Sequence, residues 1–197
     1  MRNRGVLFVV TLLLFSVPAM AIDIDTGDTV RPNPNFISFD PVTLVLGGLN
    51  ANYERLIGHC GILIEGNYTF PLLGSKSYDG VLACRYHFVE SNTGGFVGPY
   101  IKTGGLEGSI ANGSGTTYRY NFHYTTAGLS LGYRGWLWQR YHLLYTVRLG
   151  GGYPLSTTWS WNIAPPGTIN GVSTDFVKTI AEFPGYFDSE AGISFGF

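Results

Sequence analysis

The chain has 197 residues, of which 15% are aromatic, only 13% are charged and 28 are Gly. Its formal net charge of −1 gives no basic footprint for nucleic acid, so we expect no nucleic-acid partner. No segment after residue 21 approaches the ~20 consecutive apolar residues that a transmembrane helix needs. Tyr, Phe and Gly at these frequencies favour β-strands, and the length allows one domain.

The first residues have the pattern of an export signal. A positively charged start is followed by an apolar run over residues 6–17 and by small residues at Ala19 and Ala21. This pattern predicts a signal peptide over residues 1–21 that is cleaved after Ala21. The alternative of a membrane anchor is less favoured, because a run of this length is too short to span a bilayer of ~30 Å as a helix.

Eight strands are expected after a polar arm that covers residues 22–34. Side chains in a strand alternate between two faces, so apolar and polar residues in alternation indicate a strand with two different surroundings. The strands are predicted at about 35–41, 48–57, 60–70, 79–89, 96–107, 118–134, 140–153 and 186–197. In the second of them, Leu49, Ala51 and Tyr53 alternate with Asn50, Asn52 and Glu54.

The sixth strand changes phase. Its apolar residues are even-numbered at Tyr120, Phe122 and Tyr124, but odd-numbered from Ala127 to Tyr133. One extra residue near Thr125 and Thr126 would restore a single apolar face. We therefore predict a β-bulge at that point of the strand.

Charged residues lie on the polar faces of these strands. A soluble sandwich would turn them toward water, whereas a small barrel in lipid would turn them inward and its apolar face outward. The seven residues concerned are Glu54, Glu65, Arg85, Lys102, Arg148, Asp188 and Glu190. Alternation alone does not separate the two folds.

Two further patterns favour the barrel in lipid. Tyr and Trp gather near strand ends, where two interfacial belts would lie. They are Tyr68, Tyr118, Tyr120, Tyr133, Trp136, Trp138, Tyr141, Tyr153, Trp159 and Trp161. Short links at 57–59, 90–95 and 135–139 also alternate with longer ones at 42–47, 71–78, 109–117 and 154–185, as expected for an even number of strands with short turns on one side.

The longest link, 154–185, has two readings of equal weight. Ser173 and the residues after it fit a capped helix in which Phe176, Ile180 and Phe183 share a face and which Pro184 ends. Alternatively, the segment extends the seventh and eighth strands.

Two cysteines, Cys60 and Cys84, lie on the third and fourth strands. Export permits a disulfide. However, residue 60 is expected to pair near residue 90, which would separate the two thiols by ~20 Å at the rise of a strand. We therefore expect two separate thiols in the barrel wall.

The last strand alternates Phe187, Ile193, Phe195 and Phe197 with polar or small residues. It resembles the C-terminal signature of outer-membrane barrels, which the barrel assembly machinery recognises. This resemblance implies that machinery as a partner, through the strand that ends at Phe197.

The chain resembles the small eight-stranded outer-membrane barrels of the OmpA/OmpX type. The stretch L-V-L-G-G-L-N-A-N-Y-E-R-L at residues 44–56, followed by G-I-L-I-E-G-N-Y, is similar to the opening of a poorly characterised group of such barrels. The fold expected is all-β, an eight-stranded antiparallel transmembrane up-and-down β-barrel over residues 35–197 with a periplasmic N-terminal arm. The resemblance implies location in the bacterial outer membrane, with lipid and lipopolysaccharide as neighbours.

The function expected is structural, or surface binding through extracellular loops to a ligand that the sequence does not identify. No catalytic, cofactor-binding or metal-binding residue is assigned, and no enzyme activity is expected. A solute channel is a third possibility, although an eight-stranded interior is only wide enough for side chains.

The alternative of a different class is a lipid A hydrolase. The PagL-type lipid A deacylases carry H-Y-S-N-A-G, and this chain has H-Y-T-T-A-G at residues 123–128. The resemblance implies His123 as a base and Thr125 as a nucleophile that share a face. The chain departs from that motif by Thr in place of Ser and Thr in place of Asn.

Overall fold

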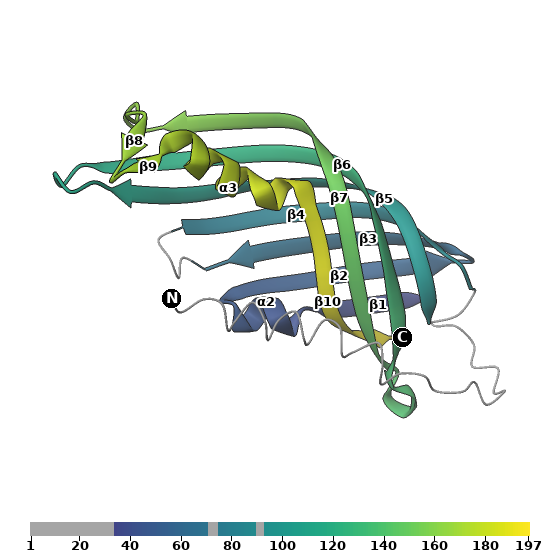
Figure 1. Cartoon of the computed structure of the whole chain (residues 1–197). Coiled ribbons are helices and arrows are strands. Elements are labelled where there is room, and N and C mark those ends of the chain that lie inside the picture. Colours follow the sequence, from purple (N-terminus) through teal and green to yellow (C-terminus); the bar gives the residue numbers. More distant parts are fainter. Residues whose placement is uncertain (1–33, 71–74, 90–92) are drawn as a thin grey trace.

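The computed structural model describes residues 34–70, 75–89 and 93–197 (Figure 1). The expected signal peptide, residues 1–21, and all but the last residue of the expected arm lie outside the described residues. The elements are β1 (Asn35–Phe39), α2 (Pro41–Val45), β2 (Gly48–Ile57), β3 (Cys60–Thr69), β4 (Ser75–His87), β5 (Gly94–Ala111), β6 (Thr117–Trp138), η2 (Gln139–Tyr141), β7 (Leu143–Trp161), β8 (Thr168–Ile169), β9 (Val172–Ser173), α3 (Thr174–Tyr186) and β10 (Phe187–Gly196).

Eight antiparallel strands close into a ring in the order β1-β10-β7-β6-β5-β4-β3-β2, and β8 and β9 form a separate hairpin. The first and last strands of the ring pair with each other. The backbone N–H of Asn35 donates to the carbonyl of Phe197 at 3.3 Å, and that of Phe197 donates to the carbonyl of Asn35 at 3.0 Å. The all-β class and the eight antiparallel strands are confirmed. None of the helices in the described part of the chain is long and apolar enough to cross a membrane.

Four strands, β4 to β7, are longer than predicted. β5, β6 and β7 project beyond the other five at one end of the ring (Figure 1). We call residues 103–111, 117–125 and 156–161 the extension, which includes this projecting part and the stretch of β5 that pairs with residues 75–80 of β4, and we call the rest of the ring the body. β2 has the predicted bounds, 48–57.

In the body, polar side chains point inward and apolar side chains point outward. All seven charged residues predicted on the polar faces are buried, and Arg85 has no exposed surface. Outward apolar side chains are half to two-thirds exposed, with Leu131 at 66%. Others on this outer surface are Ile62, Ile64, Leu82, Ile101, Leu129 and Leu149.

The extension has the opposite polarity. On the sheet face that continues the inside of the body, Phe122 and Tyr124 are buried, and the Phe122 ring packs against Trp159 with centroids 4.7 Å apart. Helix α3 covers this face: Gly185 lies against the Tyr124 ring, and Trp159 Nε1 donates to Glu182 Oε1 at 2.9 Å. The outer face of the extension carries exposed polar residues, among them Asn121, His123, Thr158 and Ser160.

The predicted bulge occurs beside Thr125 and Thr126, as expected, but it lies on β7 and not on β6. The pairing of β6 with β7 shifts between Thr125 and Thr126, whose partners are Ser156 and Pro154. The extra residue is therefore Leu155 of β7, and β6 keeps one phase from Tyr118 to Arg134; a second shift, with Leu137 of β6 as the extra residue, lies near the other end of the strand. The apolar pattern of β6 changes phase because the apolar side of the sheet changes at this height, from the outer face of the body to the inner face of the extension.

The aromatic side chains were predicted to form two outer belts, and four of them do not. Tyr118, Tyr120, Trp159 and Trp161 belong to the inner aromatic face of the extension, where Trp159 and Trp161 stack at 6.1 Å. At the opposite end of the ring, Tyr133, Trp138 and Tyr141 are exposed, as predicted.

Two links differ from the sequence reading. Residues 41–45 form a helix, α2, whose first N–H groups at Val42 and Thr43 donate to the side chain of Asp40. In the link after β7 the expected helix forms as α3, and of the expected strand extensions only that of β7 occurs, which runs on to Trp161, since β10 begins at Phe187. Helix α3 continues two residues past Pro184, which therefore does not end it.

The two cysteines are free and exposed, as expected. The predicted pairing was wrong, however. Cys60 pairs with Tyr86 rather than with a residue near 90, so Cys84 is only two positions from its partner along β4.

Candidate functional site

A cluster of buried charges fills the inside of the body. We call it the interior charge cluster, and it comprises Glu54, Glu65, Arg85, Arg134, Arg148, Asp188 and Glu190. β2, β3, β4, β6 and β7 contribute one residue each and β10 contributes two, all at inward positions, so the seven side chains converge on one another across the ring. All are at most 3% exposed. Arg134 is the one member that the sequence reading did not single out.

Glu54 joins one half of this cluster. Its carboxylate accepts from Arg85 Nη1 at 3.0 Å, from Arg134 Nη2 and, through Oε1, lies 2.9 Å from His87 Nε2. Below these contacts, Arg85 lies over the Phe96 ring at 4.5 Å. Arg134 lies over the Phe36 ring at 4.2 Å. The buried side chains of Phe36 and Phe96 therefore lie between the charges and the end of the β-sheet ring at which β1 begins and β10 ends.

Arg148 joins the other half. Its guanidinium lies 2.6 Å from Glu65 Oε2 and 2.8 Å from Asp188 Oδ2. Glu190 connects the halves, because its Oε2 accepts from Arg85 Nη2 at 3.0 Å and lies 3.5 Å from Arg148 Nη1. Buried charges with this many opposite partners are arranged to hold one another rather than to bind a mobile ion.

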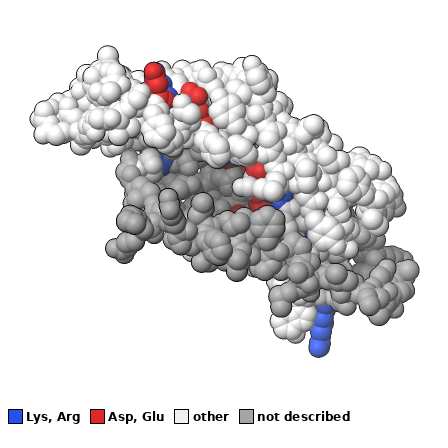
Figure 2. All heavy atoms as spheres, in the orientation of Figure 1, with Lys and Arg blue, Asp and Glu red and all other residues white. Residues whose placement is uncertain are grey.

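Toward the extension, Lys102 Nζ lies 3.7 Å from Asp79 Oδ2 and donates to the Phe187 carbonyl at 3.2 Å. Figure 2 shows acidic and basic atoms in the hollow of this face and a second group of them on the described outer surface at the upper left, whereas most of the other described atoms in this view are white.

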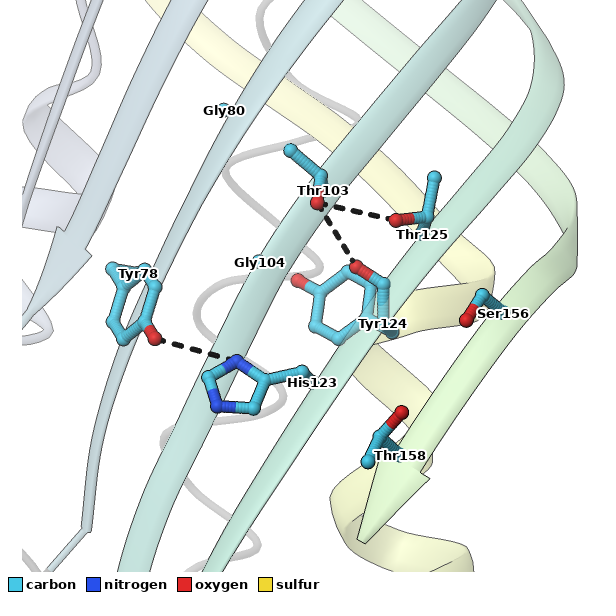
Figure 3. Close-up of a pocket in the computed structure, with 9 residues that line it drawn as sticks. All are labelled: Tyr78, Gly80, Thr103, Gly104, His123, Tyr124, Thr125, Ser156 and Thr158. Carbon is cyan, nitrogen blue, oxygen red and sulfur yellow. Dashed lines mark hydrogen bonds between the residues drawn. The ribbon is translucent and has the colours of Figure 1, made fainter.

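A second candidate site is a recess on the outer face of β4, β5, β6 and β7 (Figure 3). It has a volume of about 370 Å³, and we call it the hydroxyl recess. Its lining residues are Tyr78, Gly80, Thr103, Gly104, His123, Tyr124, Thr125, Ser156 and Thr158.

Strand pairing arranges the recess as two rows. One row runs Gly80, Thr103, Thr125 and Ser156, and the next runs Tyr78, Gly105, His123 and Thr158. Thr103 Oγ1 donates to the Tyr124 carbonyl at 3.3 Å and lies 3.2 Å from Thr125 Oγ1. In the second row, the Tyr78 hydroxyl lies 3.4 Å from His123 Nδ1.

Gly105 makes the contact between Tyr78 and His123 possible. A Cβ at this position would lie 2.7 Å from the Tyr78 hydroxyl and 2.9 Å from His123 Nδ1. One row farther out, Lys76 Nζ and Glu107 Oε2 form an exposed ion pair at 2.8 Å. The hydrogen bond to Glu107 and its negative charge raise the pKa of Lys76.

His123 and Thr125 share a face, as the sequence predicted, and both line the recess. Within the described ranges, no hydrogen bond joins them: His123 contacts Tyr78, and Thr125 contacts Thr103. No carboxylate is among the lining residues. Also within those ranges, no group of three or more His, Cys, Asp or Glu side chains is placed to hold a metal ion.

The other lining residues were not predicted. Tyr78, Thr103, Ser156 and Thr158 come from three strands, and no local motif connects them. No family model, curated protein or solved structure matches this chain.

Proposed function

We propose that the protein is a non-enzymatic β-barrel of the bacterial outer membrane. The body spans the lipid and serves as a wall element, and the extension faces the outside of the cell. The end that carries the extension and its loops binds a surface ligand.

The observation that carries this proposal is the inversion of polarity along β6. A sheet in water buries its apolar face, whereas a small barrel in lipid turns that face outward. β6 follows the second rule at Leu129 and Leu131 and the first rule at Phe122. A strand that follows both rules passes from one solvent into another. In water alone, the outward leucines of the body would form an unexplained apolar surface.

The closed ring supports the same proposal. Backbone N–H and C=O groups have no water to pair with in lipid, so a spanning sheet must have no free edge. The pairing of β1 with β10 completes the ring.

The filled interior argues for a wall element rather than a channel. The interior charge cluster occupies the centre of the ring, and Phe36 and Phe96 lie below it with at most 1% exposure. Passage of a solute would require these ion pairs to separate. We expect no stable conductance in planar bilayers, and well-defined conductance steps would favour the channel instead.

Contacts between the loops make the outer end a preformed surface. Asn170, in the turn between β8 and β9, donates from Nδ2 to the Ala111 carbonyl at 2.8 Å and accepts from the Gly113 N–H at 3.0 Å. These bonds tie the β8–β9 hairpin to the turn between β5 and β6. An ordered surface of this kind binds a ligand with little loss of loop freedom.

Helix α3 fits a position at the membrane surface. Phe176, Ile180 and Phe183 are exposed on one side of it. Phe183 stacks on Phe187, the first outward residue of β10, with ring centroids 4.5 Å apart. The apolar side of α3 is thus continuous with the outer surface of the body, as in helices that lie in the headgroup region.

The test of this proposal is folding in detergent. The folded chain, from Ile22 onward, is expected to migrate differently on a gel before and after boiling, and to resist extraction from lipid vesicles by urea. A protein that stays soluble and monomeric in buffer without detergent would contradict the proposal.

A lipid A hydrolase is the second candidate, favoured by the common position of His123 and Thr125 in the recess. The absence of a carboxylate among the lining residues leaves the imidazole without an orienting acid. Purified lipopolysaccharide is the test substrate. Deacylation that is lost in His123→Ala would support the hydrolase, and no activity in the wild type would exclude it.

A further inference from the structure

The hydroxyl recess lies where the apolar outer surface of the body ends. The row below it on the same four strands is Leu82, Ile101, Ala127 and Tyr153, of which the three larger side chains are more than half exposed. The row above its two rows begins with the ion pair of Lys76 and Glu107. The recess therefore occupies the boundary between an apolar and a charged outer surface.

The recess offers hydrogen bonds without charge. Its lining includes four Ser and Thr hydroxyls, the phenol of Tyr78 and the imidazole of His123, and each of these groups can donate or accept. Neither lysine nor arginine is among the lining residues. Lys76, one row above, is paired with Glu107, and Lys102, next to Thr103 on β5, donates to the Phe187 carbonyl. A neutral ligand with many hydroxyls therefore matches the lining better than an anion such as phosphate.

The shape of the recess also fits a ring-shaped ligand. Gly80 leaves part of the floor without a side chain, and the rings of Tyr78 and His123, which meet above Gly105, are tilted by 59° to each other. A volume of about 370 Å³ lies near the lower limit of small-molecule sites.

We propose that the hydroxyl recess binds the sugar headgroup of a glycolipid in the surrounding membrane leaflet. The acyl chains of the bound lipid lie along the apolar row of Leu82, Ile101 and Tyr153, and the sugar donates to and accepts from the hydroxyls above. This inference rests on the proposed insertion of the body into lipid. It involves binding only and no bond cleavage.

Gly80 provides the sharpest variant. A Cβ added there would point into the recess and meet no atom closer than the Glu65 carbonyl, at 3.6 Å. Gly80→Val therefore fills the recess without strain, and valine is well suited to a strand. Gly151→Val is the matched control, since Gly151 is an outward glycine of β7 in the apolar surface, with nothing within 4 Å of an added Cβ.

A second variant removes polarity without changing shape. Thr103 and Thr125 contact each other, so Thr103→Val with Thr125→Val removes both hydroxyls of that pair. If the recess holds a sugar, the loss of these hydrogen bonds weakens binding about tenfold.

The experiment uses the folded protein in three kinds of phosphatidylcholine nanodisc. The first contains a diglucosyl diacylglycerol and the second contains phosphatidylglycerol. The third contains neither of these lipids, and free maltose is added to the solution. Native mass spectrometry counts the retained molecules over a titration. We expect retention of the glycolipid by the wild type and Gly151→Val, and binding about tenfold weaker or worse in Gly80→Val and in the double threonine variant.

Three results would overturn the inference: equal retention by Gly80→Val and the wild type, equal retention of phosphatidylglycerol and glycolipid, or free maltose bound as tightly as the glycolipid. Failure of the protein to enter nanodiscs at all would instead overturn the proposed function.

Discussion

The body and the extension share the strands β5, β6 and β7, yet they bury opposite kinds of side chain. In the body, β6 places Arg134 inside and Leu131 outside. In the extension, the same strand places Phe122 inside and His123 outside, without a change of phase. Since the chain and its hydrogen bonding are continuous, the difference between the two regions lies in what surrounds them. The polarity of the inward and outward side chains therefore indicates what surrounds each part of the strand.

The largest effect is expected from breaking the interior charge cluster. Glu54→Ala removes the carboxylate that pairs with Arg85 and Arg134, while both guanidinium groups stay buried. We expect this loss to destabilise the fold by about 3–5 kcal/mol. Urea unfolding of the protein in lipid vesicles measures the change. Glu107→Ala removes an exposed ion pair and should cost less than about 1 kcal/mol. Equal effects of the two variants would show that the inside of the body is not a closed, buried region.

The aromatic interior of the extension should respond to loss of volume. Phe122→Ala removes a ring that packs against Tyr124 and Trp159, so we expect a loss of about 3 kcal/mol. Tryptophan fluorescence during urea unfolding reports on the contact with Trp159. Asn121→Ala, an exposed neighbour, should change stability by less than about 0.5 kcal/mol. A negligible effect of Phe122→Ala would mean that α3 does not cover this face.

The outer faces of the two regions should tolerate charge differently. Leu131→Arg places a guanidinium on the outer surface of the body and should cost about 2 kcal/mol in vesicles. Ser160→Arg, on the outer face of the extension, should cost less than about 0.5 kcal/mol. Because both positions are exposed, a protein surrounded by water would show the same small effect at each. That result would remove the distinction between the regions.

The sequence was sufficient where the signal is local. Alternation within β2 predicted its bounds, and alternation within the other strands predicted the seven buried charges, because neighbours in a strand face opposite sides whatever the partner strand is. The change of phase in β6 was real but was assigned to a bulge in that strand. A single strand carries no information on which of its faces a later helix, here α3, will cover.

The candidate site was much less predictable. The shared face of His123 and Thr125 followed from their spacing, but the recess around them depends on the register of four strands. Tyr78 meets His123 only because β4, β5 and β6 pair with Gly105 between them. Contacts across several strands of this kind leave no periodic trace in the sequence. Arg134, by contrast, is in phase with the inward positions of β6, as Arg148 is on β7, so alternation could have found it.

The central claim is that the level of Thr125 marks the boundary of the membrane. Spin labels at single cysteines along the outer face of β6, at 119, 121, 123, 129, 131 and 133, test it most directly, in a background where Cys60 and Cys84 are replaced by Ser. The account predicts a crossover in lipid vesicles: labels at 129–133 are accessible to oxygen, and labels at 119–123 are accessible to a water-soluble nickel complex. Accessibility to the nickel complex at all six sites would contradict it.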